Sequence, residues 1–121
     1  MRSVLVLAGA ALLLPASAST ATQTGLWGTM RRGPITPVCF DNRPCDEPAA
    51  NVTIVFVRNG REAARVTTRG NGSYRIALRP GVYSVRTPKK IAIGSGLEPS
   101  RVRVPSGRRA RVNFFIDTGI R

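Results

Sequence analysis

The stretch that decides the fold is residues 52–87, VTIVFVRNGREAARVTTRGNGSYRIALRPGVYSVRT. Runs of β-branched and aromatic residues alternate here with turn residues, which is the pattern of short strands joined by tight connections. The Asn-Gly pair at 59–60 favours a two-residue hairpin, because both central positions of that turn need a positive φ. Gly-Asn-Gly at 70–72 and Pro-Gly at 80–81 mark two further turns. This stretch predicts strands at 52–57, 61–68, 73–78 and 82–87.

The flanking segments add three predicted strands, at 26–30, 101–104 and 108–117. Two irregular stretches interrupt the series, a proline-rich one at 33–51 that holds both cysteines and a second at 88–100. Strands recur about every ten residues and no helical period is visible. The sequence therefore predicts an all-β fold, a single antiparallel β-sandwich of about seven strands with Greek-key connections. A length of 121 residues fits one domain.

Alternation along the strands assigns the two faces, because successive side chains of a strand point to opposite sides. Ile54, Phe56, Tyr74 and Tyr83 are typical of the residues expected in the core, and nearly all arginines are expected to point outward. Three apolar residues break the pattern and are expected to form an outer contact patch: Val55, Val57 and Phe115.

Residues 1–18 have the layout of a secretory signal peptide: a basic start, an apolar run at 4–14 and a small-x-small site that ends at Ala18. As a helix the apolar run would measure about 16 Å, half of a bilayer core, so no membrane span is expected in the mature chain. The alternative is a buried N-terminal helix of a cytosolic protein. We expect cleavage near Ala18, a secreted or extracytoplasmic product, a flexible lead-in at 19–24 and the sandwich domain at 25–121.

Cys39 and Cys45 are the two cysteines of the chain. Outside the cytosol a pair at this spacing favours a disulfide. A redox dithiol or a metal-binding pair are the alternatives, but the chain has no histidine and no third cysteine to complete a metal site. We therefore predict a disulfide that closes a short loop within the proline-rich stretch.

Two motifs carry a family resemblance. Residues 68–76 (TRGNGSYRI) and 78–85 (LRPGVYSV) resemble the signature of carboxypeptidase-regulatory-like domains, and 48–54 (PAANVTI) is similar to the opening of that pattern. Arg69 stands where the family often has Asp. The resemblance covers residues 25–116 and implies a transthyretin-like (prealbumin-like) β-sandwich. It also implies an accessory role, in folding support, surface adhesion, or carbohydrate and protein contact, rather than a reaction.

Candidate catalytic chemistry is sparse. Without histidine the common nucleophilic triads cannot form. Asp41, Asp46 and Glu47 lie close together in sequence beside Arg43, where solvent-exposed ion pairs are expected. Acid–base catalysis and weak binding of a hard cation are the alternatives for this group. We predict no catalytic, cofactor-binding or metal-binding residues, and hence no enzyme.

Charge is the outlying property, with 19 basic residues against 6 acidic ones and a net charge of +13. Such a surface attracts polyanions, although an arginine-rich composition can also reflect the genome rather than a function. The aromatic residues are few and Trp27 is the one tryptophan, which argues against single-stranded nucleic acid as a specific partner. The candidate polyanion contacts are the densest basic sites: Arg31, Arg32, Lys89, Lys90, Arg108, Arg109 and Arg111.

Together these features predict a secreted, non-catalytic β-sandwich module for protein interaction or structural support, without cofactors. The expected partner is a protein or another component of the cell envelope. The alternative function is a cationic binder of an anionic cell-surface polymer or lipid. Neither a specific nucleic acid nor a membrane span of the mature form is expected.

Overall fold

Strands account for all the regular secondary structure in the residues that the computed structural model describes, 24–88 and 96–120. The predicted signal peptide at 1–18 and residues 19–23 of the lead-in lie outside these ranges. Thr24, the last lead-in residue, is held in place, because its hydroxyl donates to the carbonyl oxygen of Leu78 at 2.7 Å. The strands are β1 (Gly25–Gly33), β2 (Glu47–Pro48), β3 (Thr53–Arg58), β4 (Arg61–Thr67), β5 (Ser73–Ala77), β6 (Gly81–Arg86), β7 (Leu97–Glu98), β8 (Arg101–Val104), β9 (Arg109–Arg111) and β10 (Phe114–Asp117).

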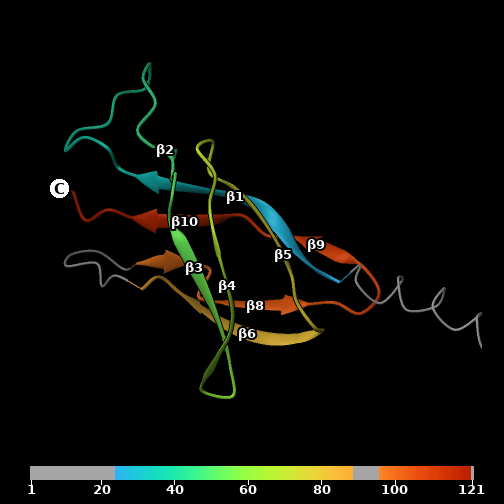
Figure 1. Cartoon of the computed structure of the whole chain (residues 1–121). Helices are drawn as coiled ribbons and strands as arrows, with labels where there is room; N and C mark the ends of the chain where they lie inside the picture. Colours follow the sequence, from blue (N-terminus) through green and yellow to red (C-terminus); the bar gives the residue numbers. More distant parts are fainter. Residues whose placement is uncertain (1–23, 89–95, 121) are drawn as a thin grey trace, which may run out of the picture.

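The strands form two sheets, so the predicted all-β sandwich is confirmed (Figure 1). One sheet is antiparallel and has the order β4-β3-β6-β8. The other is built around β1: β5 and β9 flank its first half, and β2 and β10 flank its second half. β7 extends this sheet beyond β10. The Greek-key order of the connections stays a prediction.

The strand count and the pairing differ from the sequence prediction. The two-residue strands β2 and β7 lie within stretches predicted to be irregular, and the expected closing strand at 108–117 is divided into β9 and β10. Both of these strands run parallel to β1, so this sheet is not purely antiparallel. Strands as short as β2 and β7 have no periodicity of their own, and only their partner strands define them.

Gly28, in the middle of β1, lies where the partner strand changes from β9 to β10. A Cβ at this position would overlap the carbonyl oxygen of Val112. The break in the partner strand is closed by side chains: the Asn113 Oδ1 accepts the backbone N–H of Thr29 at 3.0 Å, and the Tyr74 hydroxyl donates to the Val112 carbonyl at 2.6 Å. Side chains thus take the place of the ladder hydrogen bonds that the interrupted strand lacks.

The core between the sheets is aliphatic with a small group of aromatic rings. The Phe56 ring meets Tyr83 edge-on, with the ring centroids 6.4 Å apart, and Tyr74 packs against Phe114 at 5.5 Å. Aromatic contacts at these ring separations add to the free energy of burial. Ile54, Phe56, Tyr74 and Tyr83 are all buried, as predicted, and no arginine of the described ranges is buried.

The expected outer patch of Val55, Val57 and Phe115 does not form. Val55 and Val57 lie on β3, whereas Phe115 lies on β10 of the other sheet. Val55 has no exposed surface at all. Its cross-strand neighbours are Arg65 and Arg86, long side chains whose aliphatic stems can cover an apolar neighbour. Alternation along the strand predicts that Val55 points to the outer face of the sheet. It does not predict that side chains of the neighbouring strands cover Val55 there.

The turns follow the sequence closely. Asn59 and Gly60 both have positive φ, at 54° and 76°, as the predicted β3–β4 hairpin requires. In the turn before β5, the Gly72 N–H donates to the Arg69 carbonyl and the Ser73 N–H to the side chain of Asn71. Arg69, which departs from the family pattern, thus leaves the hydrogen bonds of this turn intact.

Thr68 is the buried polar side chain of the described residues, with 2% of its surface exposed. Its hydroxyl donates to the carbonyl oxygen of Ala49 at 2.6 Å and accepts the N–H of Val52 at 2.9 Å. Together with two backbone hydrogen bonds between Thr68 and residues 51–52, this hydroxyl attaches the segment before β3 to the end of β4. The Ala49 carbonyl and the Val52 N–H would lose this partner if the hydroxyl were removed.

We expect Gly28→Ala to lower the free energy of unfolding by about 3 kcal/mol or more, since the added methyl group must displace backbone. Gly70→Ala is the matched control, because a Cβ there meets nothing within 4 Å. Urea unfolding of both variants measures the difference. Equal stability of the two would contradict the close approach of β1 to Val112.

We expect Thr68→Val to lower the free energy of unfolding by about 1–3 kcal/mol, the cost of leaving buried backbone groups without a partner. Thr67→Val is the control, because Thr67 lies at the surface one residue earlier in the chain. Thermal and urea unfolding provide the measurement. A loss no larger than that of the control would mean that water or another group replaces the hydroxyl.

Candidate functional site

Cys39 and Cys45 form a disulfide, as predicted, with their Cα atoms 5.5 Å apart. The disulfide closes a loop that connects β1 to β2 and extends away from the sandwich (Figure 1). Within this loop the Arg43 guanidinium lies over the ring of Phe40, 5.6 Å from its centroid. The disulfide thus constrains a surface loop rather than the core.

The acidic group predicted beside Arg43 does make surface ion pairs, but with different partners. Asp46 pairs with Arg31 at 2.6 Å, and Glu47 pairs with Arg32 at 2.7 Å. The reason is the pairing of β2 with β1, which places this acidic segment against the end of β1. Exposed ion pairs of this kind add little stability, but they offset charge locally.

The structure does not gather the candidate polyanion contacts into one patch. Arg31 and Arg32 lie in the second half of β1 and face the carboxylates described above. Arg109 and Arg111 lie on β9, beside the first half of β1, and Arg108 is exposed just before them. Lys89 and Lys90 lie outside the described residues.

Trp27 is central to the basic surface that does form. It lies on β1 between Arg75 of β5 and Arg111 of β9, which are its cross-strand neighbours on the two sides. The Arg111 guanidinium lies over the indole, 5.2 Å from the ring centroid. Even so, 44% of the Trp27 surface is exposed. A large aromatic ring is thus held at the surface between two cations.

A shallow hollow of about 470 Å³ lies beside this ring. Arg69, from the turn before β5, and Arg109 complete its basic lining, and the Nε of Arg109 is buried without a hydrogen-bond partner. We call this surface the Trp27 face. It consists of Trp27, Arg69, Arg75, Arg109 and Arg111.

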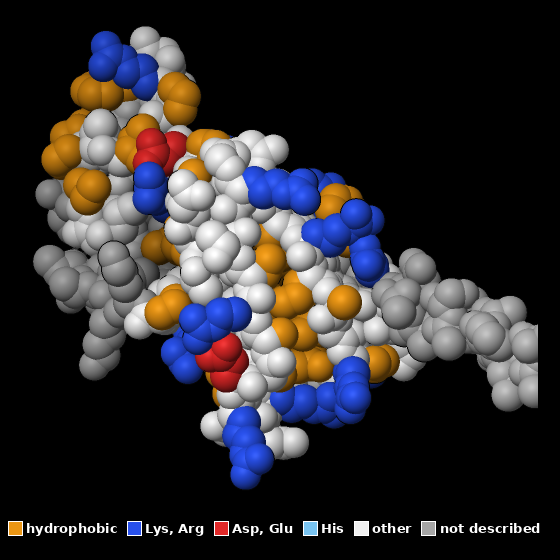
Figure 2. Space-filling view, viewed as in Figure 1, with side chains coloured by type: hydrophobic (Ala, Val, Ile, Leu, Met, Phe, Trp, Pro, Cys, Tyr) orange, Lys and Arg blue, Asp and Glu red, His pale blue; other side chains and the backbone are white. Residues whose placement is uncertain are grey.

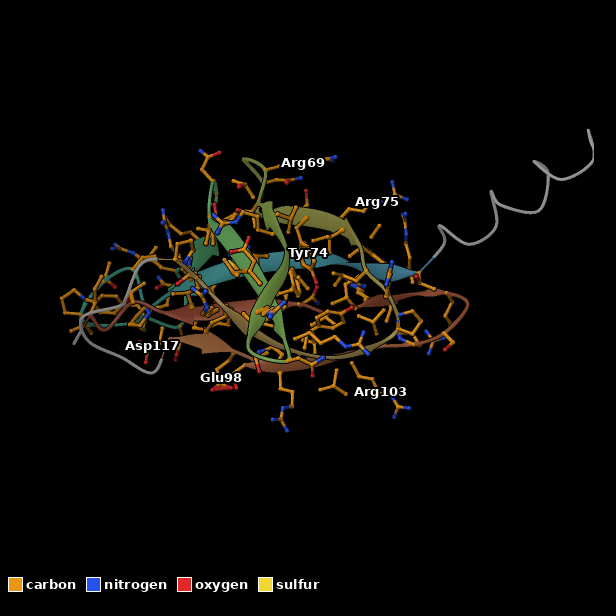
Figure 3. All side chains as sticks on the ribbon, turned by 60° about the horizontal axis from the view of Figure 1, so that its bottom comes forward. Arg69, Tyr74, Arg75, Glu98, Arg103 and Asp117 are labelled. Atoms are coloured by element: carbon orange, nitrogen blue, oxygen red, sulfur yellow. A yellow bond between two sulfur atoms is a disulfide. The ribbon has the colours of Figure 1, made fainter. Side chains whose placement is uncertain are left out.

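Acidic residues lie elsewhere. Figure 2 shows basic side chains gathered over β9 and the start of β1 without an acidic side chain beside them. In Figure 3, Arg69 and Arg75 lie at one side of the sandwich, and Glu98 and Asp117 lie toward its other end. Glu62 belongs to the opposite sheet, where a hydrogen bond from Arg65 lowers its pKa. Among the described residues, none that lines the hollow is acidic.

Tyr74 contributes to the floor of the hollow without being a candidate for proton transfer. Burial raises the pKa of its phenol well above the usual range. The hydroxyl donates to the Val112 carbonyl, which fixes the ring below Trp27's strand. The Tyr74 side chain therefore has a structural role beneath the hollow, and its phenol stays protonated near neutral pH.

The Trp27 face has the chemistry of a binding surface for anions. Guanidinium groups bind carboxylate, sulfate or phosphate groups through bidentate hydrogen bonds. An exposed indole provides a flat apolar surface. Elsewhere in the described ranges, no three His, Cys, Asp or Glu side chains come close enough to hold a metal ion. Those same ranges contain no helix of the length and hydropathy needed to cross a membrane.

Sequence reasoning identified Arg109 and Arg111 but missed three members of the Trp27 face. Trp27 was considered only as a sign of scarce aromatic residues, and Arg69 and Arg75 only as turn and outward-facing strand residues. The available signal was a tryptophan at an outward position of the strand predicted at 26–30, where Leu26 and Met30 point to the core. The register that places β5 and β9 on either side of it has no local signature.

Comparison with known proteins adds no family assignment. No protein-family model matches the chain, and no curated protein matches its sequence. The resemblance to carboxypeptidase-regulatory-like domains therefore rests on the motifs at 68–76 and 78–85 and stays a prediction.

We expect the fluorescence of Trp27 to be quenched several-fold more strongly by iodide than by caesium at low ionic strength, because the surrounding arginines concentrate anions. The single tryptophan of the chain makes the signal unambiguous. The difference should disappear at about 1 M sodium chloride, where the Debye length is about 3 Å. Arg75→Ala should reduce it more than Arg103→Ala does. Equal quenching by both ions at low salt would refute this description.

Proposed function

We propose that this chain is a non-catalytic β-sandwich module that is exported, and that it acts by binding a partner or by supporting a structure in the extracytoplasmic space. The disulfide supports this location, since such bonds persist in oxidising compartments. The leader-like pattern at 1–18 points the same way. The motif resemblance adds an accessory role in a carboxypeptidase-regulatory-like, prealbumin-like sandwich.

The observation that carries the non-catalytic role is how the reactive side-chain types are used. Asp46, Glu47 and Glu62 make ion pairs with arginines at the surface. The two tyrosine hydroxyls donate to backbone carbonyls, Tyr74 to Val112 and Tyr83 to Arg79. These carboxylates and hydroxyls therefore stabilise the fold. The basic groups that remain suit binding of a ligand rather than catalysis.

The second candidate function is binding of an anionic polymer or lipid of the cell surface, and the Trp27 face is the specific observation that favours it. Arginines there have no carboxylate partners in the described part of the chain, unlike Arg31 and Arg32. Their charge is available to a ligand without first breaking an ion pair.

Export is tested by producing the full chain in a host with a secretory pathway. We expect the exported protein to lack residues 1–18 and to contain no thiol that reacts under denaturing, non-reducing conditions. Intact-mass measurement and thiol titration check both points. A full-length chain retained in the cytosol, or two reactive thiols, would overturn the proposed location.

Binding is tested by incubating the processed protein with cell envelopes and native culture supernatant over a range of ionic strengths. Retention that falls steeply between low and high salt supports the anionic-polymer or lipid candidate. Capture of a defined protein that persists at high salt supports the protein-interaction role instead. Failure to bind any envelope or supernatant component at low salt would count against both.

A further inference from the structure

The Trp27 face combines an exposed aromatic ring with several guanidinium groups that form no ion pair with a carboxylate of the described residues. We propose that this face is a binding site for acidic polysaccharide, in which the Trp27 ring stacks on a sugar and the surrounding arginines bind the anionic groups. The proposal rests on the proposed function, because it names the ligand class of the second candidate.

The geometry suits a linear chain with charges at regular intervals. Arg75 and Arg111 lie on the strands at either side of Trp27, so their backbones are two strand spacings apart, about 10 Å. This is a length that a disaccharide unit can cover. The Arg111 guanidinium lies over the indole, 5.2 Å from the ring centroid, so a sugar would pack on the part of the ring that remains exposed. Anionic substituents of that sugar would then lie beside Arg75 and Arg111.

Arg109 contributes a further guanidinium to the hollow, and its Nε has an unusual environment. Its Nε is buried and has no hydrogen-bond partner, which is uncommon in folded proteins and unfavourable. Arg109 lines the same hollow as Arg69 and Arg75. An anionic group bound in the hollow would neutralise this cluster of guanidinium groups, whereas the buried Nε itself is not exposed to a surface ligand.

Acidic polysaccharide fits better than single-stranded nucleic acid or a lipid surface. A single-stranded nucleic acid site uses several aromatic rings to stack successive bases, whereas Trp27 is the one aromatic ring exposed on this face. A lipid surface favours a group of apolar side chains that insert together. The neighbours of Trp27 on the face are arginines and the polar residues Thr29 and Ser73.

The opposite sheet provides a matched control surface. Arg101 and Arg103 lie on the outer side of β8 and are exposed, so this face has basic charge as well. Its exposed apolar neighbour is Val82, which is 51% exposed and has no ring. Figure 3 shows Arg103 on the side of the sandwich away from Arg69 and Arg75.

The test measures the binding of defined probes to variants of the whole processed protein. Arg75→Ala/Arg111→Ala and Arg101→Ala/Arg103→Ala remove the same charge from the two faces, and Trp27→Ala removes the ring without changing charge. The probes are oligogalacturonate, heparin-derived oligosaccharide, neutral dextran, oligothymidylate and phosphatidylglycerol vesicles. Calorimetry gives the dissociation constants, and thermal unfolding confirms that each variant is folded.

We expect the wild type to bind at least one acidic oligosaccharide and no dextran. Arg75→Ala/Arg111→Ala should weaken that binding about tenfold or more, and Arg101→Ala/Arg103→Ala less than about threefold. Trp27→Ala should weaken it about fivefold or more. Equal losses from the two double variants, or an unchanged affinity of Trp27→Ala, would show binding by net charge alone. Tighter binding to oligothymidylate or to the vesicles at matched charge would also overturn the proposal.

The failure of this inference can be told apart from failure of the proposed function. If the variants of the Trp27 face bind cell envelopes as the wild type does, the module remains a binder and only the assignment of this face is wrong. If the chain is neither exported nor retained by envelopes, the proposed function fails, whatever its affinity for oligosaccharides.

Discussion

The close approach of β1 to the two-residue connection between β9 and β10, residues 112–113, is the constraint on which the rest of the structure depends. Because Gly28 lacks a side chain, the Val112 carbonyl can lie against β1 while two different strands pair with its two halves. The first half then carries Trp27 between two basic strands, and the second half carries the ion pairs with β2. The candidate site thus follows from the position of one glycine.

Charge is distributed unevenly along the same strand. Carboxylates pair with the arginines at the second half of β1. At the first half, every charged residue that lines the hollow is an arginine among the described residues. The contrast does not follow from composition, since an arginine-rich chain with few acidic residues could have scattered its ion pairs. A binding surface needs this separation, because paired charges attract a ligand far less than unpaired ones.

Much of the fold could be predicted from local pattern. Asn59-Gly60 identified the hairpin, alternation placed Phe56 and Tyr83 in the core, and the cysteine spacing predicted the disulfide. What could not be predicted depends on long-range register. The placement of Trp27 beside Arg111 joins residues 84 positions apart, and the burial of Val55 depends on neighbouring strands. Neither relationship can be recognised in a short stretch of sequence, so the candidate site became visible only once the strand pairing of the sheet was known.

The outer strands of the four-stranded sheet have a further consequence. Among the described strands, β4 and β8 have a partner in that sheet on one side of their backbone only, and both contain arginines. Unpaired strand edges invite edge-to-edge association between copies, and like charges on them oppose it. The basic exterior should therefore also act as a solubility device that keeps concentrated protein from polymerising through its open edges.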